Sequence, residues 1–295
     1  MKKYIFILIA LFSFSCKKVL DDALPYTNDK LVLFAIVSPA SKLTITVERT
    51  YPPTGKIIFN DEYLSSVQGE LYEDGKEVGK FTRLAGTQFG VNYIPKEGKM
   101  YFVKMRAKDF EEASSTPVSI PEKPIINSVV FNEKYVSPTN PEVESKKLSV
   151  SLSDTKDKKN YYSMELISRS KDDKITINDY RYLDKLKDIQ DNCINSVLLE
   201  WLFNDICFEN QTKIFNFSVS KQGYEQPSGK VVDATVMRLK VKNISEGYYK
   251  YLTTKVYKLD FSQVFSPIKP QFTNVKNGYG AVVSMNETSF DLLNK

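Results

Sequence analysis

Residues 66–83 read SVQGELYEDGKEVGKFTR, and this stretch predicts a β-hairpin. Asp74 and Gly75 stand between two runs of strand-forming residues. An Asp-Gly pair is a strong signal for a two-residue hairpin turn, because both residues tolerate positive φ. The hairpin indicates that the N-terminal part of the chain is built from antiparallel strands.

The segments on either side of this hairpin give further strand signals at intervals of about ten residues. Leu31–Val37 is a continuous apolar run that suits a buried strand, and residues 42–48 alternate between polar and apolar, as in a half-exposed strand. Further strands are expected at Gln88–Ile94 and Met100–Lys108. We therefore expect residues 31–121 to form a β-sandwich of the immunoglobulin or fibronectin type.

A second domain is expected after a linker marked by Pro117, Pro121 and Pro124. Residues 125–295 should form a β-rich domain with short helical insertions, so the fold class is mainly β. Apolar residues in this part recur at the spacing of a strand in five segments. These segments are 125–131, 148–152, 161–168, 213–220 and 234–241.

Three other segments of the second domain show helical spacing of their apolar residues. Two of them fall within residues 179–203, at Asp179–Gln190 and Ser196–Phe203. The third covers residues 246–259 and has Ser245 as its expected N-cap, because a serine side chain can accept a hydrogen bond from the first turn.

The first sixteen residues, MKKYIFILIALFSFSC, combine two lysines, an apolar stretch, a small residue and Cys16. The apolar stretch is shorter than the roughly 20 residues of a membrane-spanning helix, so residues 1–15 are expected to be a signal peptide. A cysteine after a small residue resembles the lipobox of bacterial lipoproteins, although Ser13 replaces the usual aliphatic residue. We expect Cys16 to be acylated and residues 16–30 to form a lipid anchor and tether. A secreted protein with an unmodified cysteine is the alternative.

Charge and composition exclude several kinds of site. The chain has 41 Lys and Arg against 36 Asp and Glu, and removal of the two leader lysines gives 39 − 36 = +3. This small, dispersed charge does not suit nucleic-acid binding. The sequence has no His, which excludes Ser-His-Asp and Cys-His nucleophilic sites and His-ligated metals. We expect no metal and no cofactor.

Cys193 and Cys207 form an even pair in a chain that is expected to be exported, so a disulfide is predicted. This prediction conflicts with the helical spacing between them. A continuous helix from 193 to 207 would separate the two Cα atoms by about 21 Å, whereas a disulfide requires about 4.4–6.8 Å. A helix limited to residues 196–203, followed by a fold-back, would reconcile the two.

Leu198, Trp201 and Phe203, inside this cysteine segment, are the candidate contacts to a partner or ligand. If the segment projects as a stapled loop, they form an exposed apolar patch, and such patches mark interfaces. The alternative is that Trp201 packs in the core. No motif in the sequence points to catalysis.

Several pieces of the chain stand in a characteristic order and spacing. They include Cys16–Val19, Leu71–Gly75 (LYEDG), Asn160–Tyr162, Ile244–Leu252 (ISEGYYKYL), Phe265–Pro267 and Asn274–Gly280 (NVKNGYG). Together these pieces resemble a family of Bacteroidetes outer-membrane lipoproteins, which is grouped as domain of unknown function 4249 (DUF4249) and is encoded beside TonB-dependent receptors. The C-terminal strand departs from the family pattern, because Ala281-Val282-Val283 replaces a glycine-rich stretch.

The resemblance implies a lipid-anchored outer-membrane lipoprotein that is a non-enzymatic accessory or binding subunit of a TonB-dependent transporter. Its expected partners are the membrane, through the N-terminal lipid, and a TonB-dependent outer-membrane receptor; the resemblance names no ligand. Charged residues just after Cys16 resemble surface-export signals and favour the cell surface over the periplasmic face. A structural or adhesive envelope protein is the alternative, and a surface hydrolase that uses two carboxylates is a third hypothesis.

Overall fold

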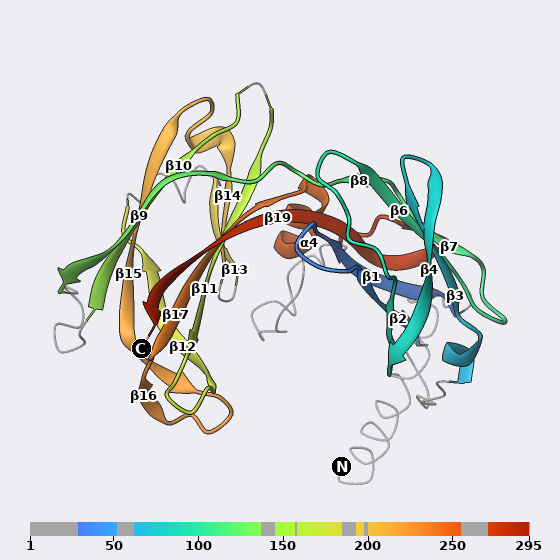
Figure 1. Cartoon of the computed structure of the whole chain (residues 1–295), viewed down its shortest axis with the longest axis horizontal. Helices are drawn as coiled ribbons and strands as arrows, with labels where there is room; N and C mark the ends of the chain where they lie inside the picture. The colour runs from blue at the N-terminus through green and yellow to red at the C-terminus, as the bar shows by residue number, and fades with distance from the viewer. Residues whose placement is uncertain are drawn as a thin grey trace, which may run out of the picture.

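The computed structural model describes residues 29–51, 62–136, 145–156, 158–184, 193–197, 200–254 and 271–294. These residues form two lobes of β-strands, and the long strand β19 (Gly278–Asn294) runs through both lobes (Figure 1). Backbone hydrogen bonds link the strands into one mixed sheet. The helix α4 (Glu246–Thr254) lies beside β19 between the lobes. The prediction of a mainly β protein is confirmed.

The N-terminal lobe packs two groups of strands around an apolar core. The first group contains β1 (Leu31–Val37), β2 (Thr44–Arg49) and β5 (Gln88–Gly90). The second contains β3 (Gln68–Glu73), β6 (Met100–Arg106), β7 (Ala113–Ser115) and β8 (Val118–Ser119), and β4 (Lys76–Ala85) pairs with strands of both groups. A short 3₁₀ turn, η1 (Glu62–Ser66), precedes β3.

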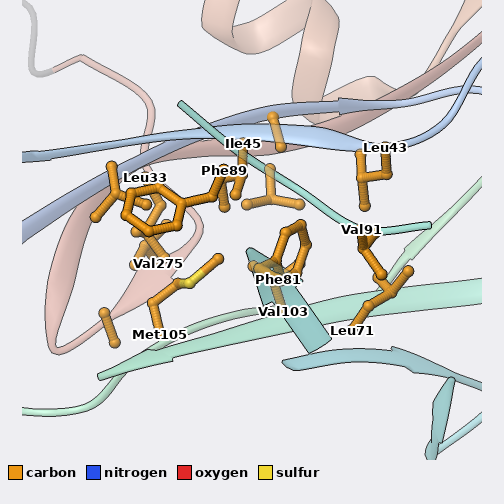
Figure 2. Packing of buried hydrophobic residues seen from close by; sticks show 14 of the residues in the cluster. Leu33, Leu43, Ile45, Leu71, Phe81, Phe89, Val91, Val103, Met105 and Val275 are labelled. Carbon is orange, nitrogen blue, oxygen red and sulfur yellow. The ribbon is translucent and has the colours of Figure 1, made fainter. Parts of the chain in front are cut away.

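Figure 2 shows how the side chains of the two groups meet in the core of this lobe. Leu33 and Phe89 from the first group lie opposite Val103 and Met105 from the second, and all four are buried. The two-sided packing explains the regular alternation of buried and less buried residues along β1 and β6. The immunoglobulin or fibronectin strand order expected for residues 31–121 stays a prediction.

The β3–β4 hairpin has the expected turn. Glu73 pairs with Lys76, and the two residues between them, Asp74 and Gly75, have φ of 49° and 81°. Both values lie in the left-handed region that a two-residue hairpin turn of this type requires. The Asp-Gly signal therefore identified the turn correctly.

The C-terminal lobe is a sheet that curls around an aromatic core. In pairing order it contains β9 (Ile125–Tyr135), β10 (Ser145–Ser153), β15 (Thr212–Glu225), β12 (Ile175–Tyr182), β11 (Tyr161–Arg169) and β17 (Val236–Ile244), and then β19. β14 (Glu200–Asn204) pairs with β11 and with β13 (Ile194–Val197), and β16 (Val231–Asp233) pairs with β15. The fully buried rings of Phe203, Phe215 and Phe217 form the centre of the core.

The helices predicted for Asp179–Gln190 and Ser196–Phe203 are wrong where the structure describes these segments. Residues up to Tyr182 continue strand β12, and β13 and β14 form a hairpin. The reason is that both faces of β14 are covered: Phe203 packs in the lobe core, and Leu202 packs in a cluster beside α4. A strand buried on both faces has no alternation, so its apolar residues match a helical spacing equally well. Residues 185–192, Leu198 and Leu199 lie outside the described residues.

The helix predicted for residues 246–259 is confirmed over Glu246–Thr254, and residues 255–259 lie outside the described part of the chain. Ser245 caps it as expected, because its Oγ accepts a hydrogen bond from the backbone N of Tyr248 at 3.3 Å. Tyr248 and Leu252, which lie four residues apart on one face of the helix, are buried in the cluster between the lobes.

β19 connects the two lobes with a single strand. Gly278–Ser284 run parallel to β1, and residues 285–294 run antiparallel to β17. Residues 275–284 therefore lie in the N-terminal lobe, although the sequence assigned all of 125–295 to the second domain; β18 (Val275–Lys276) also pairs there, with β7. Gly280 has φ of +104°, and a Cβ there would lie 2.0 Å from the carbonyl oxygen of Leu33. Only glycine fits at this position of the pairing between β1 and β19.

Candidate functional site

A groove of about 630 Å³ opens in the C-terminal lobe where two strands separate. β12 pairs with β11 at only two positions, Ser168 with Thr176 and Arg169 with Ile175, and then leaves to pair with β15. β14 occupies the same edge of β11, but only up to Glu165. The opening between β12 and β14 is the β12 groove. Its apolar and aromatic lining consists of Leu166, Ile177, Tyr180, Trp201, Tyr224 and Val231, and its polar lining includes Asn178, Asp179, Arg181 and Gln222.

A buried amide fixes the wall of the β12 groove. The pairing of β12 with β15 shifts register between Asn178 and Tyr180, which is a β-bulge. The Asn178 Nδ2 donates to the carbonyl of Ser220 at 2.9 Å, and its Oδ1 accepts from the Thr176 hydroxyl at 3.0 Å. A Cβ on Gly223 would lie 2.5 Å from the same Oδ1. These hydrogen bonds satisfy the buried amide of Asn178 and hold the bulge in place. The bulge is therefore a stable feature of this wall of the groove.

One side of the groove is an exposed apolar patch formed across three strands. Ile177 on β12 lies opposite Tyr224 on β15, and Tyr224 lies opposite Val231 on β16. Tyr224 is 60% exposed and Val231 is 54% exposed. Ile175, two residues before Ile177, is also exposed. A group of large exposed apolar side chains around a concavity is typical of a binding surface.

Trp201 and Tyr180 line the inner part of the groove. The Trp201 indole N–H donates to the Tyr180 carbonyl at 3.4 Å, and the Trp201 ring lies 5.7 Å from that of Tyr182. The Tyr180 ring packs 4.6 Å from Phe217. Its hydroxyl is buried and has no hydrogen-bond partner among the residues that the structure describes. Burial raises the pKa of this phenol well above its usual value, so the hydroxyl remains a donor.

The charges around the groove compensate one another. Asp179 and Arg181 form an ion pair at 2.9 Å on its rim. At the end of the adjacent hairpin, Lys174 contacts Glu225 at 3.2 Å. The pKa of Glu225 is lowered by hydrogen bonds from Ser228 and Lys174. The groove therefore offers no unbalanced charge among its described lining residues.

The disulfide between Cys193 and Cys207 is confirmed, with a Cα–Cα distance of 5.8 Å. The geometric conflict disappears because the chain between the cysteines forms the β13–β14 hairpin. After β14, the chain turns through the 3₁₀ helix η2 (Asp205–Cys207), and the Asn204 side chain accepts a hydrogen bond from the backbone of Ile206. The disulfide therefore links the residue before the β13–β14 hairpin to the turn that follows it.

The structure separates the three residues that the sequence offered as contacts. Trp201 lines the β12 groove, Phe203 is fully buried in the core, and Leu198 lies outside the described residues. The stapled segment therefore does not expose Phe203, whose side chain points into the lobe. Tyr180, Asn178 and Tyr224 also form the groove but were not singled out from the sequence. The alternation of polar and aromatic residues in TINDYRY, residues 176–182, was the available signal.

Two carboxylates meet at a buried lysine on the other face of the same sheet. The Lys242 ammonium is 6% exposed and contacts Glu165 at 2.6 Å and Glu200 at 2.7 Å. Burial alone lowers the pKa of Lys242, but Glu200 and Glu165 outweigh this effect and the net shift is upward. Ser163 donates to Glu200 at 3.2 Å. The cluster balances its charge internally, as a structural ion-pair network does.

The described residues contain no helix long and apolar enough to cross a bilayer and no group of three or more metal-ligating side chains. A family model, the domain of unknown function DUF4249, matches residues 17–291. The chain belongs to this family. The DUF4249 match extends through both lobes, β19 and the β12 groove. No curated protein matches the sequence.

Proposed function

We propose that this DUF4249 protein is a lipid-anchored outer-membrane lipoprotein that acts as an accessory binding subunit of a TonB-dependent transporter. The proposal rests on the lipobox-like Cys16 after a leader and on the lipoprotein and receptor context of the resemblance. Cys16 itself lies outside the described residues. Two or more acyl chains on Cys16 would give stable attachment without any spanning helix.

The observation that carries the binding role is the position of the β12 groove relative to the N-terminal end of the described chain. The described chain enters at Asp29, which forms an ion pair with Arg49 in the N-terminal lobe. The β12 groove lies in the other lobe, at the end of the molecule where β12 and β16 are labelled (Figure 1). A body tethered through one lobe can present a groove with the other.

The connection between the lobes is suited to keeping them in a fixed relative position. β19 is hydrogen-bonded to β1 in one lobe and to β17 in the other. Side chains of both lobes and of α4 share one apolar cluster, which includes Phe34, Tyr161 and Leu252. We propose that the lobes act as one body, which holds the groove at a fixed place relative to the anchor.

The proposal assigns no enzymatic activity to the protein. Among the described residues that line the groove, Asp179 is the one carboxylate, and Arg181 neutralises it. Two carboxylates about 5–10 Å apart in a cleft are what a glycoside hydrolase needs. The Glu165 and Glu200 pair is instead bridged by Lys242.

Affinity purification of the tagged, lipidated full chain from detergent-solubilised outer membranes tests the receptor partnership. We expect a TonB-dependent receptor to co-purify in near-stoichiometric amount. The matched variants are Tyr224→Ala in the groove patch and Tyr279→Ala, an exposed tyrosine of the N-terminal lobe. Recovery of the lipoprotein alone, from several detergents, would contradict the partnership.

The anchor and its side of the membrane are tested separately. Cys16→Ala should abolish labelling by a fatty-acid analogue and move the protein from the membrane to the soluble fraction. Protease added to intact cells should digest the wild type if the body lies at the cell surface, as we propose. Protection until the outer membrane is permeabilised would place the body on the periplasmic face instead.

A further inference from the structure

We propose that a second cavity, the β1 pocket, binds a small organic cation of the quaternary ammonium type. The β1 pocket has a volume of about 350 Å³ and lies on the outer face of β1, in the other lobe from the β12 groove. Four aromatic residues and one carboxylate contribute to its lining: Phe34, Tyr251, Phe272, Tyr279 and Glu48. The inference goes beyond the proposed function, because it concerns a different site and does not depend on the receptor.

The strand register places Glu48 and Tyr279 on either side of the small side chain of Val32. Val32 on β1 pairs with Glu48 on β2 and with Tyr279 on β19. This row lies on the face of the sheet that is turned away from the core, since Leu31 and Leu33 on either side of Val32 are the buried residues. Neighbouring strands are about 4.8 Å apart, so β2 and β19 are about 10 Å apart across β1. A cation above Val32 can therefore contact both side chains.

Aromatic rings form much of the remaining lining. Phe34 lies on the same face of β1 as Val32, and the Tyr251 ring of α4 packs with its centroid 5.3 Å from that of Phe34. Phe272 lies just before β18, and Tyr279 is 49% exposed, so its ring is accessible to a ligand. Aromatic faces attract cations, and clusters of such rings are the usual sites for quaternary ammonium groups.

The charge of the β1 pocket favours a cation over an anion. Glu48 is the one charged side chain among the described residues that line the pocket. Its carboxylate is exposed and has no ion-pair or hydrogen-bond partner in the described part of the chain. Lys30 lies nearby, with its Nζ 5.9 Å from the centroid of the Tyr279 ring, but it forms no ion pair with Glu48. A bound cation would supply the counter-ion that Glu48 lacks.

The size and lining of the pocket select the type of cation. A volume of about 350 Å³ is at the lower end of the range of small-molecule sites, about 300–1,000 Å³, so the ion must be small. A primary ammonium is strongly hydrated and its N–H groups need acceptors. A quaternary ammonium has no N–H group, so it loses no hydrogen bond when aromatic walls replace water. The aromatic lining therefore favours the quaternary ion.

The test compares choline with 3,3-dimethylbutan-1-ol, in which a carbon atom replaces the charged nitrogen and the shape is kept. The protein is the full chain carrying Cys16→Ala, so that it bears no acyl chains that require detergent. Saturation-transfer NMR follows the methyl protons of each probe, and calorimetric titration is the second readout. We expect a Kd of about 1 mM for choline and at least about tenfold weaker binding of the neutral alcohol. Equal affinity for both probes, or no binding of choline, would overturn the proposal.

Variants of the two flanking side chains locate the site. Glu48→Gln removes the charge and should weaken choline binding about fivefold, with no effect on the neutral alcohol. Tyr279→Ala removes a ring and should also weaken choline binding about fivefold. Lys30→Met removes a like charge and should strengthen it about twofold. Glu77→Gln, at an exposed carboxylate on β4, is the matched control and should change nothing. Unchanged choline affinity in both Glu48→Gln and Tyr279→Ala would overturn the proposal.

A last pair of measurements separates the free ion from a lipid headgroup and from the receptor. Phosphatidylcholine vesicles carry the same trimethylammonium group as a headgroup. Co-sedimentation of the Cys16→Ala chain with these vesicles, without binding of free choline, would overturn the assignment of a free ion. Tyr279→Ala should lose choline binding and still recover the receptor from the outer membrane. Loss of the receptor in this variant, with choline binding intact, would make the region around Tyr279 a protein interface instead.

Discussion

The two lobes use the same kind of strand but bury different side chains. Among the described residues, the N-terminal lobe buries three polar side chains, Ser38, Ser115 and Ser284, around an otherwise apolar core. The C-terminal lobe, from Ser145 to Asn243, buries 16 polar or charged residues. Each buried polar group needs a partner of defined geometry. The first lobe is therefore specified mainly by apolar packing, and the second also by hydrogen-bond networks.

This difference explains why the groove lies in the C-terminal lobe. A sheet closed only by apolar packing loses contacts when a strand separates from its neighbour. In the second lobe, Asn178 holds β12 to the backbone of β15 across the bulge, so β12 stays bonded to the sheet where it leaves β11. The hydrogen bonds of Asn178 thus hold β12 in place where it lines the groove.

The strongest test of this comparison is Lys242→Met, which removes a buried charge from the C-terminal lobe. It leaves the Glu165 and Glu200 carboxylates partly buried without their cation, and we expect a loss of about 4 kcal/mol in unfolding free energy. Denaturant unfolding followed by Trp201 emission measures this. Because the pKa of Lys242 is raised, its contribution is full below about pH 10 and is lost as the pH rises further.

Lys240→Met is the matched control, two residues earlier on the same strand and face. Lys240 is 27% exposed and contacts only Glu287 among the described residues, at 3.1 Å, so its loss should cost at most about 1 kcal/mol. Equal effects of the two substitutions would show that burial of the charge network does not distinguish this lobe.

Removal of the disulfide should have the next largest effect. The double variant Cys193→Ala/Cys207→Ala opens a loop with a sequence separation of 14, and the chain-entropy model gives a loss of about 3 kcal/mol. Hydrogen exchange should show the loss in β13 and β14, with β1, β3 and β6 unchanged. Equal loss of protection in both lobes would mean that they unfold as one unit.

The two lobes also differ in how far their sequences predict them. In the N-terminal lobe, Asp74-Gly75 and the alternation of Leu43, Ile45 and Val47 are local signals, and each was correct because burial follows one face of a strand. In the C-terminal lobe, β14 is buried on both faces, so its spacing imitates a helix. Neither the pairing of β14 with β11 nor the return of β19 to β1 leaves a local trace.

The candidate site was predictable only in part. Trp201 was singled out because it lies in the segment between Cys193 and Cys207, and it does line the groove. Tyr180 was assigned to a helix and Asn178 to no element, and the roles of both depend on the bulge between β12 and β15. The exposure of Tyr224 depends on its cross-strand neighbours Ile177 and Val231. Such pairings between distant segments are set by tertiary structure, which overrides local preference.

Gly280→Ala tests the pairing of β19 with β1, which attaches this strand to the N-terminal lobe. The added Cβ would lie 2.0 Å from the Leu33 carbonyl oxygen at a φ of +104°, so β19 must shift away from β1. We expect a loss of about 2 kcal/mol in unfolding free energy, together with faster hydrogen exchange in β1.

Gly229→Ala separates the cost of a positive φ from the cost of a steric clash. Gly229 also has a positive φ, +70°, but a Cβ there meets nothing within 4 Å. Its substitution should therefore cost only about 1 kcal/mol. If the two variants were equally destabilised, the close approach of β19 to β1 would not explain why glycine is required at position 280.

The smallest expected effect is at Glu73, one of the few carboxylates of the N-terminal lobe with a network of its own. Tyr101 and Tyr93 both donate their hydroxyls to Glu73, and these hydrogen bonds lower its pKa. Glu73→Gln weakens both acceptor contacts and should cost about 1 kcal/mol at neutral pH, measured by thermal unfolding.

The pH dependence of that loss gives the sharper result. Because the pKa of Glu73 is lowered on folding, its contribution is full above about pH 5 and disappears as the pH falls below about 4, where wild type and Glu73→Gln should converge. Glu77→Gln, an exposed position on the same hairpin, should stay within about 0.5 kcal/mol at every pH. If Glu73→Gln still destabilised the protein at acidic pH, that loss would have to come from packing. The N-terminal lobe would then depend on apolar contacts even at the polar end of its hairpin, which would widen its contrast with the C-terminal lobe.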